Sequence, residues 1–237
     1  MMEIIDFHSH VLPGIDDGSA SLEESIALLQ AERNQGIGHV VATPHFYPMY
    51  DDPNRFFSDR AEAEKALRRE LEVWPNLPEL SVGAEVYFFH GISQSDVLEG
   101  LTIGGNRCIL IEMPGSPWTD AMYRELEQIS ERRGLIPVVA HVDRYISPFR
   151  THGIPDRLAK LPVLVQANAS FFLRSSTRSL ALKLLRQDKI HLLGSDCHNL
   201  STRPPLLGDA VEVIRQRLGE EPLERICAYQ KALFPVK

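Results

Sequence analysis

Short apolar runs alternate along the chain with longer stretches in which apolar residues recur every three or four positions. The short runs predict buried β-strands, and the longer stretches predict amphipathic α-helices between them. The expected strands cover residues 3–8, 39–44, 80–86, 107–112, 136–141, 162–168 and 190–195. The expected helices cover residues 22–35, 55–74, 119–133, 176–188, 206–218 and 222–233.

Two strand candidates, "CILIEM" and "PVVAHV", are apolar almost throughout. Strands that helices cover on both faces have this composition, so the pattern favours a parallel sheet in an α/β fold. About seven strand–helix repeats in 237 residues fit a closed or nearly closed barrel better than a five-stranded open sheet. Because no low-complexity linker or charge block divides the chain, we expect a single domain over residues 1–237.

The chain is acidic, with 25 Lys and Arg against 32 Asp and Glu and a formal net charge of −7. This balance argues against binding to nucleic acid or to an anionic membrane, because both need clustered basic side chains. An anionic substrate must therefore be captured by a local site.

The chain also lacks the features of an exported or membrane-inserted protein. The start "MMEIIDF" has no signal-peptide character, and no apolar run approaches the roughly 18 residues of a membrane span. The 3 cysteines are widely spaced and suit reduced thiols. We expect a cytoplasmic protein, and no pattern in the sequence sets its oligomeric state.

Ionisable side chains gather where the expected strands end. The strand ends read "DFHSH", "ATPH", "GAEVY", "LIEMP", "VAHVDR", "VQANAS" and "GSDCH". The carboxyl ends of parallel strands meet at one edge of the sheet, and active sites of α/β folds are built at that edge. The candidate site residues there are His8, His10, His45, Glu85, Glu112, His141, Asp196 and His198.

Two pairs of these candidates are spaced two residues apart, His8 with His10 and Asp196 with His198. Residues with this spacing on a strand project to the same side. Closure of a barrel brings its first and last strands together, so both pairs could reach the same ion. The remaining histidines stand at strand starts or in connections and are expected outside the site: His39, His90, His152 and His191.

Two interpretations of this cluster differ in whether it binds metal. A buried polar network without ions would crowd several carboxylates, which repel one another and raise their pKa values. Bound cations would neutralise that repulsion, so we favour a metal centre. Imidazole and carboxylate ligands without a thiolate suit Mn, Fe or Zn. Cys197 stands between two candidates, and strand alternation should point it away from them.

With these residues placed, the chain resembles the polymerase-and-histidinol-phosphatase (PHP) superfamily of metal-dependent phosphoesterases. The motifs that carry the resemblance are "DFHSHVLPGIDDG", "TPH", "GAEVY", "LIEMP", "AHVDRY", "SDCHN" and "RPP", and they span nearly the whole chain. Within the superfamily, the chain looks like the manganese-dependent protein-tyrosine phosphatases of bacterial capsule and exopolysaccharide loci. The resemblance implies a distorted (β/α)7 barrel with a trinuclear metal centre.

Carried over to this sequence, the resemblance assigns ligands to three divalent ions, with Mn expected and Fe or Zn as alternatives. The ligands of the first ion would be His8, His10, Glu85 and Asp196. Those of the second would be Glu85, as a bridge, with Glu112 and His141. Those of the third would be Asp17, His45 and His198.

The resemblance also implies a phosphate site and a substrate. Arg144 and Arg203 would bind the phosphate, since a guanidinium pairs bidentately with its oxygens; the alternative for each is a surface ion pair. A metal-bridging hydroxide would attack phosphorus in line. The expected partner is a phosphotyrosine protein, the tyrosine-rich tail of a polysaccharide co-polymerase kinase. Asp16 is expected to cap the turn before Gly18 rather than bind metal.

Other interpretations stay open at the level of sequence. A phosphatase of a small metabolite such as histidinol phosphate would use the same metal site, and a non-catalytic partner of a tyrosine kinase could keep the fold. "CHNLSTR", from Cys197 to Arg203, has the C-x5-R spacing of thiol-based tyrosine phosphatases. It contains no glycine to fold around a phosphate, and two prolines without N–H groups follow it, so we expect this match to be accidental.

Four aromatic residues flank the proposed ligands: Phe46, Tyr47, Tyr87 and Phe88. They would either stack on a substrate phenyl ring or pack in the core, as aromatic side chains commonly do.

Overall fold

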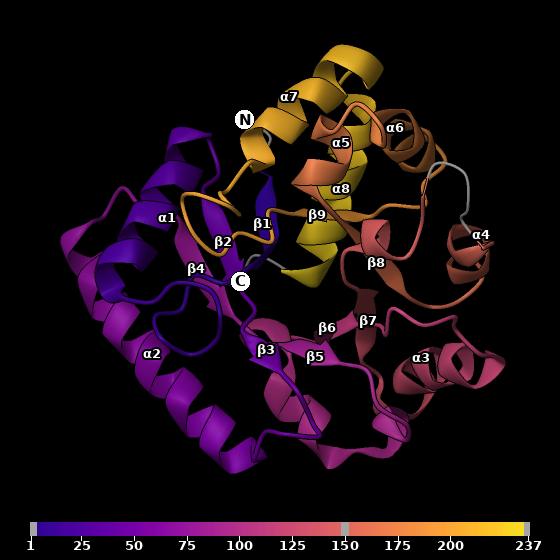
Figure 1. Ribbon diagram of the computed structural model, residues 1–237, viewed down its shortest axis with the longest axis horizontal. Helices are drawn as coiled ribbons and strands as arrows, with labels where there is room; N and C mark the ends of the chain where they lie inside the picture. The colour runs from indigo at the N-terminus through magenta and orange to yellow at the C-terminus, as the bar shows by residue number, and fades with distance from the viewer. Residues whose placement is uncertain (1–3, 148–151, 235–237) are drawn as a thin grey trace.

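Parallel strands surround the centre of the molecule, and helices lie outside them (Figure 1). The computed structural model describes residues 4–147 and 152–234. The strands are β1 (Ile5–Ser9), β2 (His39–Ala42), β3 (His45–Phe46), β4 (Glu79–Val82), β5 (Glu85–Tyr87), β6 (Cys108–Glu112), β7 (Ile136–Val139), β8 (Leu164–Asn168) and β9 (Leu192–Gly194). Each expected strand is present, and position 3 of the first one lies outside the described residues.

Six longer helices cover the strands, close to the expected bounds: α1 (Leu22–Asn34), α2 (Pro53–Val73), α3 (Asp120–Arg133), α6 (Arg178–Arg186), α7 (Leu207–Leu218) and α8 (Glu221–Leu233). The side chains of Ser21 and Asp52 begin α1 and α2 by accepting hydrogen bonds from the N–H groups of Glu24 and Arg55. Two short helices were not expected, α4 (Ile154–Leu158) and α5 (Ala169–Leu173). Within the described residues, no helix has the length and apolar character needed to cross a bilayer.

Two breaks interrupt the parallel strands. The expected strand 39–44 matches β2, and β3 follows Pro44 beyond the expected end; the expected strand 80–86 divides into β4 and β5. β2 and β4 join β1 in a sheet of order β1-β2-β4, and β3 and β5 join the order β3-β5-β6-β7-β8-β9. These two breaks distort the barrel. The predicted α/β fold is confirmed, and its parallel sheet is curled.

The barrel closes between its first and last strands. The Asp196 N–H donates to the carbonyl oxygen of His8 at 2.8 Å, and the His10 N–H donates to that of Cys197 at 2.9 Å. Nearby, the buried Asp6 carboxylate accepts hydrogen bonds from the N–H and hydroxyl groups of Ser195 at 2.8 and 2.6 Å. The two ligand pairs from opposite ends of the chain are therefore adjacent.

A β-bulge in β1 aims its histidines into the barrel. Asp6 pairs with Val40, and Ser9 pairs with Ala42, so β1 has one more residue than β2 between these two pairs. Phe7 packs among apolar residues inside the ring of strands, which include Leu110, Val138 and Leu192. Strict alternation would turn His8 to the opposite face, whereas the extra residue lets His8 share the interior with Phe7.

Candidate metal centre

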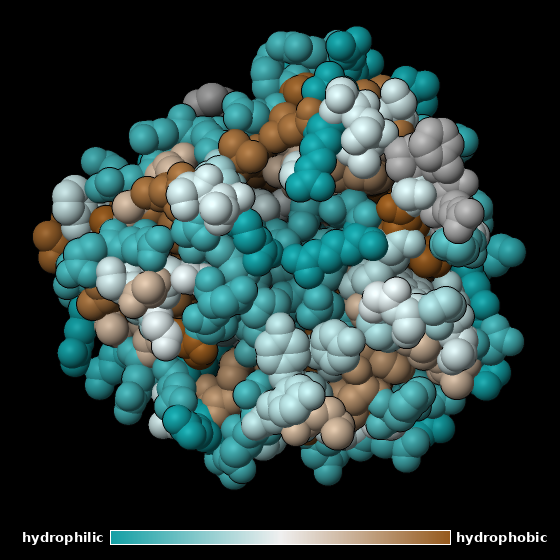
Figure 2. Space-filling model, viewed as in Figure 1, coloured by the Kyte–Doolittle hydropathy of each residue, from teal (hydrophilic) through white to brown (hydrophobic). Residues whose placement is uncertain are grey.

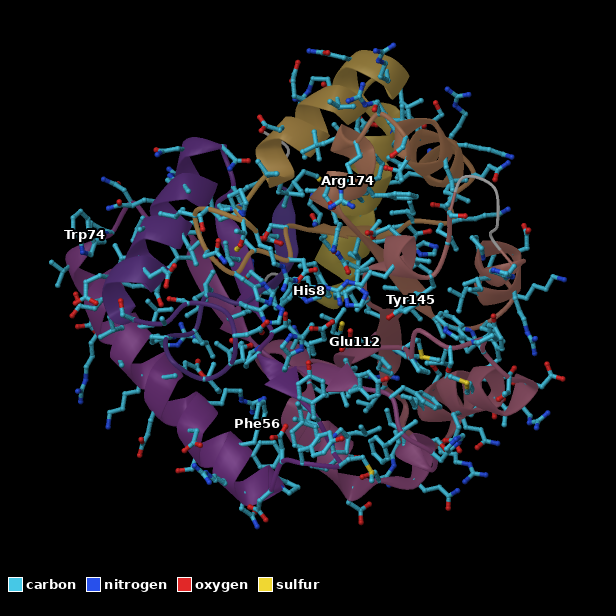
Figure 3. All side chains as sticks on the ribbon, viewed as in Figure 1. His8, Phe56, Trp74, Glu112, Tyr145 and Arg174 are labelled. Carbon is cyan, nitrogen blue, oxygen red and sulfur yellow. The ribbon has the colours of Figure 1, made fainter. Side chains whose placement is uncertain are left out.

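The histidines and carboxylates predicted at the strand ends lie together at the centre of one face of the molecule, around His8 and Glu112 in Figure 3. Together with Asp17, the eight strand-end residues are linked through side-chain atoms less than 4 Å apart: His8, His10, Asp17, His45, Glu85, Glu112, His141, Asp196 and His198. Figure 2 shows hydrophilic residues gathered around a hollow in this face.

The deepest part of the centre consists of the four residues predicted for the first ion. Nε2 of His8 lies 3.1 Å from Nε2 of His10 and 3.3 Å from Oε2 of Glu85. Oδ1 of Asp196 lies 3.7 and 3.6 Å from the same two ring nitrogens. All four residues are buried. Their donor atoms thus converge on one buried point.

Glu85 connects this group to the residues predicted for the second ion. Its Oε1 lies 2.6 Å from Nε2 of His141, and the same nitrogen lies 3.6 Å from Oε1 of Glu112. Glu85 Oε2 faces Nδ1 of His45 at 2.9 Å. The two oxygens of one carboxylate therefore face different groups, as a bridging ligand requires.

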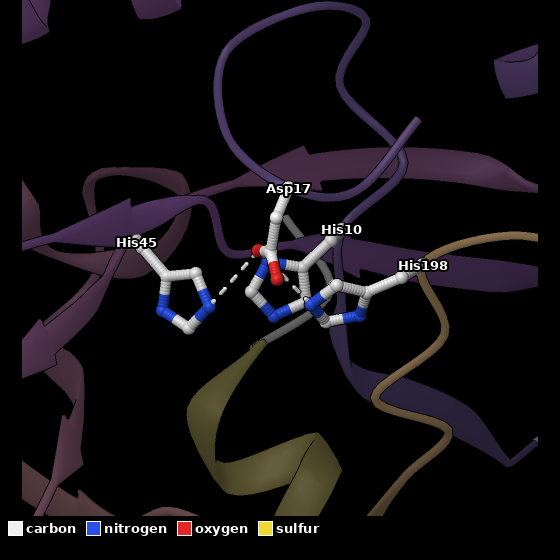
Figure 4. A group of neighbouring side chains, drawn as sticks. All are labelled: His10, Asp17, His45 and His198. Atoms are coloured by element: carbon white, nitrogen blue, oxygen red, sulfur yellow. Dashed lines mark ion pairs between the residues drawn. The ribbon is translucent and has the colours of Figure 1, made fainter. Parts of the chain in front are cut away.

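The residues predicted for the third ion surround Asp17, which descends from the loop after β1 (Figure 4). Asp17 Oδ1 lies 3.4 Å from Nε2 of His45 and 3.3 Å from Nε2 of His198. The ring of His10 joins this group, with its centroid 3.9 Å from that of His198. His10 thus stands between the first and third groups.

The donor atoms fit metal ions because several of them are buried without a hydrogen-bond partner. Among the described residues, Nδ1 of His45, Oε2 of Glu85 and Nε2 of His198 are in this condition. Orphaned polar atoms are costly in a protein interior. Nδ1 of His45 and Oε2 of Glu85 face each other, Nε2 of His198 faces Asp17, and cations bound between these groups would satisfy them.

The ionisable groups of the centre strongly shift one another's pKa values. Burial lowers the pKa of His8, but the carboxylates of Glu85 and Asp196 outweigh burial and raise this pKa to about 9. Burial alone would raise the pKa of Glu85, yet His8, His141 and His45 hold it well below its usual range. Without ions, protons on imidazoles balance the carboxylates, and metal binding would displace them.

His198 and Glu112 have shifts of the opposite kind. Burial, together with electrostatic repulsion from His10 and Arg203, lowers the pKa of His198 to about 4. This ring is therefore neutral at pH 7, which is the form that binds metal. Burial and the neighbouring Glu85 raise the pKa of Glu112.

Asp16 performs the expected turn capping and a second role. Its Oδ1 accepts a hydrogen bond from the Gly18 N–H at 2.9 Å, as predicted. Its Oδ2 lies 2.7 Å from Nδ1 of His10 and also accepts from the His45 N–H at 3.1 Å. The cap therefore also orients one ligand ring and the backbone of another ligand, which the sequence analysis missed.

Uncharged residues orient two further proposed ligands, His141 and Asp196, and were not predicted from the sequence. Oε1 of Gln166 accepts from the His141 N–H at 2.6 Å, and the Tyr145 hydroxyl lies 3.3 Å from Nδ1 of His141. The side-chain amide of Asn168 donates to Oδ2 of Asp196 at 2.8 Å. Gln166 and Asn168 stand in the strand end "VQANAS", but an amide gives no signal in a search for ionisable groups.

Both predicted arginines reach the centre. The Arg144 guanidinium lies 2.8 Å from Oδ2 of Asp196 and 3.1 Å from Oε1 of Glu112. The Arg203 guanidinium lies 2.6 Å from Oδ1 of Asp196. The exposed fraction is 39% for the Arg144 side chain and 35% for the Arg203 side chain. Their guanidinium groups therefore stand between the ligands and solvent, where an incoming anion arrives.

The C-x5-R segment does not form a phosphate-binding loop. Cys197 is fully buried, and burial raises its pKa well above the usual range, so the thiolate is suppressed. The N–H groups of Ser201, Thr202 and Arg203 all donate to Oδ1 of Asn199. The loop thus consumes the backbone donors that a thiol-based phosphatase would offer to phosphate.

The aromatic neighbours divide between core and rim. Phe46 and Phe88 are buried in the core. Tyr47 is partly exposed, stacks on His45 at 5.1 Å between ring centroids, and lies 5.9 Å from the ring of Tyr87. Only the two tyrosines can therefore contact a ligand at the rim.

The histidines expected outside the site have other surroundings. Nε2 of His39 lies 2.9 Å from the Ser81 hydroxyl, and Nδ1 of His191 accepts from the Val165 N–H at 3.0 Å. His90 and His152 are exposed and belong to none of the possible metal-binding groups among the described residues.

Two of the site residues have a left-handed backbone. The φ angle is +30° at His141 and +54° at Asp196. Residues other than glycine adopt this region at a cost, and such strain concentrates at functional sites. The sharp turns after β7 and β9 thus accompany the placement of both side chains in the centre.

Comparisons with known proteins agree with this architecture. Residues 4–232 match the family described as "Capsular polysaccharide synthesis, CpsB/CapC". Tyrosine-protein phosphatase CpsB of Streptococcus agalactiae serotype III (strain NEM316) is 29% identical over 239 residues, covering 92% of each chain. Tyrosine-protein phosphatase YwqE of Bacillus subtilis (strain 168) is 29% identical over 236 residues, covering 92% of this chain and 86% of its own.

A solved structure shares the fold of this chain over nearly the whole length of both chains. It is described as belonging to YwqE from Bacillus subtilis and CpsB from Streptococcus pneumoniae, "unique metal-dependent tyrosine phosphatases". It superposes with a TM-score of 0.83 at 23% identity, covering 99% of this chain and 96% of its own.

Proposed function

Because this chain belongs to the CpsB/CapC family of capsular polysaccharide synthesis, we propose that it is a metal-dependent protein-tyrosine phosphatase. The single observation that carries the proposal is the convergence of buried imidazole nitrogens and carboxylate oxygens on one point, beside two arginines. Such a site suits hydrolysis of a phosphate ester rather than mere binding, because it combines metal ligands with anion-binding cations.

The centre would hold three divalent ions, with manganese as the native metal. We assign His8, His10, Glu85 and Asp196 to the first ion. Glu85, Glu112 and His141 go to the second, and Asp17, His45 and His198 to the third. The mixture of nitrogen and oxygen ligands without sulfur supports a metal of this class. When bound, the ions supply a water nucleophile of lowered pKa and positive charge for the phosphoryl oxygens.

The residues of the chain itself position the substrate. Arg144 and Arg203 exchange their ion pairs with Asp196 for the phosphoryl oxygens, since a guanidinium pairs bidentately with either group. Tyr47 and Tyr87 offer ring faces to the substrate phenyl group at the rim. The departing phenolate has a pKa near 10, so it needs less protonation than a serine alkoxide.

The substrate protein would be the phosphotyrosine tail of a polysaccharide co-polymerase kinase. The role of the family in capsular polysaccharide synthesis supports this partner. The acidic net charge of −7 supports a protein substrate over nucleic acid.

The deciding experiment assays metal-analysed enzyme on a phosphotyrosine peptide and on histidinol phosphate. We expect peptide hydrolysis that EDTA abolishes and added Mn²⁺ restores, and a much lower kcat/KM on histidinol phosphate. His141→Ala should lose both bound metal and activity, whereas His90→Ala, at an exposed histidine outside the centre, should retain both. A strong preference for histidinol phosphate would overturn the proposed substrate.

A further inference from the structure

A cavity extends from the arginines of the metal centre toward α5. It has a volume of about 510 Å³ and is lined at the centre by Arg144, Asp196 and Arg203, and elsewhere by Ser170, Arg174 and Pro204. Cavities that enclose whole small ligands measure roughly 300–1,000 Å³. This one is therefore larger than a phosphate group needs, and the rest of a substrate held by Arg144 and Arg203 has room inside it.

Arg174 is a third arginine in the wall of this cavity, and it differs from the other two. Arg144 and Arg203 each lie within 3 Å of an Asp196 oxygen. Within residues 4–147 and 152–234, no hydrogen bond or ion pair involves the Arg174 guanidinium. Arg174 is thus an unpaired cation that opens onto the substrate cavity of an acidic protein.

The backbone of Arg174 is fixed although its side chain is exposed. Its N–H donates to the Ser170 carbonyl at 3.1 Å, and its own carbonyl accepts from Thr177 and Arg178 at 3.1 and 2.9 Å. α5 directly follows Asn168, whose side-chain amide donates to Asp196. The base of the Arg174 side chain is therefore tied through α5 to the metal centre, on the side opposite Glu112 in Figure 3.

We infer that Arg174 is a specificity-determining residue that binds a second anionic group of the phosphotyrosine substrate, a carboxylate or a second phosphoryl group near the scissile one. The inference rests on the proposed function. A guanidinium pairs with either anion through two parallel hydrogen bonds. Arg144 and Arg203 would hold the reacting phosphate, and Arg174 would then favour peptides with negative charge beside the phosphotyrosine.

The test compares peptides that differ at one position. One series moves a Glu through the three positions on either side of the phosphotyrosine in a neutral peptide, with Gln peptides as the reference. A second series places another phosphotyrosine at the same positions. For the best position, we expect kcat/KM to exceed that of the Gln peptide by about fivefold, the upper range for a partly exposed ion pair.

Variants of Arg174 assign this preference to the side chain. Arg174→Gln should reduce the ratio between charged and neutral peptides to about one, and Arg174→Lys should restore part of it because the charge returns. Arg186→Gln is the matched control, since Arg186 is exposed on α6 and does not line the cavity. It removes the same charge and should leave the ratio unchanged.

The outcomes separate this inference from the function on which it rests. Preference in the Glu series identifies a carboxylate as the second group, and preference in the phosphotyrosine series identifies a phosphoryl group. A ratio near one for the wild-type protein, or a ratio that Arg174→Gln leaves unchanged, overturns the role of Arg174 while the phosphatase activity stands. If the metal-loaded enzyme hydrolyses none of the peptides, the proposed function itself is overturned.

Discussion

Oδ2 of Asp16 lies 2.7 Å from Nδ1 of His10, on the side of the imidazole ring that faces away from His8. This contact fixes which ring nitrogen of His10 is free to bind metal, because Nε2 remains for the centre. His10 and Asp16, the aspartate of the following turn, thus act as one unit.

Asp16→Asn should lower metal affinity by about 10–100-fold, the usual effect of losing a carboxylate that orients a ligand. Titration of the metal-free protein with Mn²⁺ measures this change. Asp52→Asn is the control, because it makes the same chemical change at the cap of α2. Wild-type affinity in Asp16→Asn would show that the contact with His10 does not prepare the ligand.

Arg203→Lys should lower kcat/KM for a phosphotyrosine peptide by about 100-fold, as losses of preorganised charged donors commonly do. Lysine keeps the charge but lacks the planar fork that pairs with two oxygens. Elemental analysis should find the metal content unchanged, which separates phosphate binding from metal binding. Arg186→Lys should retain full activity, and full activity in Arg203→Lys would exclude the arginine from phosphate binding.

The metal-free protein should lose stability between pH 7 and 8.5 because of His8. Its pKa is about 9 in the folded chain and 6.5 when unperturbed, so its contribution is complete below pH 6.5 and disappears as the pH rises through 9. Over the chosen range the loss should be about 2 kcal/mol of the free energy of unfolding. Urea unfolding in EDTA measures it.

The control for this pH effect is His8→Asn. The variant should lack the His8 contribution, so its free energy of unfolding should change less over the same range. His198 has the opposite sign, but its contribution is nearly complete at pH 7 because its pKa is lowered from 6.5 to about 4. The same pH dependence in both proteins would locate the titration elsewhere.

Cys197→Ser should leave kcat within about tenfold of the wild-type value, since the buried thiol forms no part of the reacting centre. EDTA should abolish the activity of both proteins. Complete loss of activity in a folded, metal-loaded Cys197→Ser protein would instead support the thiol mechanism.

The sequence predicts the barrel and the ligand cluster well because both depend on local patterns. Apolar runs locate all seven strands, and the charged residues directly after them share one edge by the geometry of parallel sheets. The two breaks were not predicted: the expected strand 39–44 ends before β3, and the expected strand 80–86 runs through Gly83 without interruption. Only the hydrogen bonds of neighbouring strands reveal where the ladder is interrupted.

The bulge in β1 and the supporting amides were beyond the reach of sequence patterns for a different reason. The alternation of inward and outward side chains along a strand does not predict the extra residue between Asp6 and Ser9. This residue lets Phe7 and His8 face the same interior. Gln166 and Asn168 are defined by their partners at the ends of the two adjacent strands, not by their neighbours in the chain. Their roles appear only once β8 lies beside β7 and β9.

The left-handed backbone at His141 and Asp196 would make the stability of this protein depend on metal supply. Conformations of this kind cost about 1–3 kcal/mol each, and ions bound by the same side chains, as we propose, would offset that cost. We expect a cell deprived of transition metals to accumulate less of the protein, because the empty chain opens more often and proteases remove it. Capsule output would then follow metal supply through protein turnover as well as through catalysis.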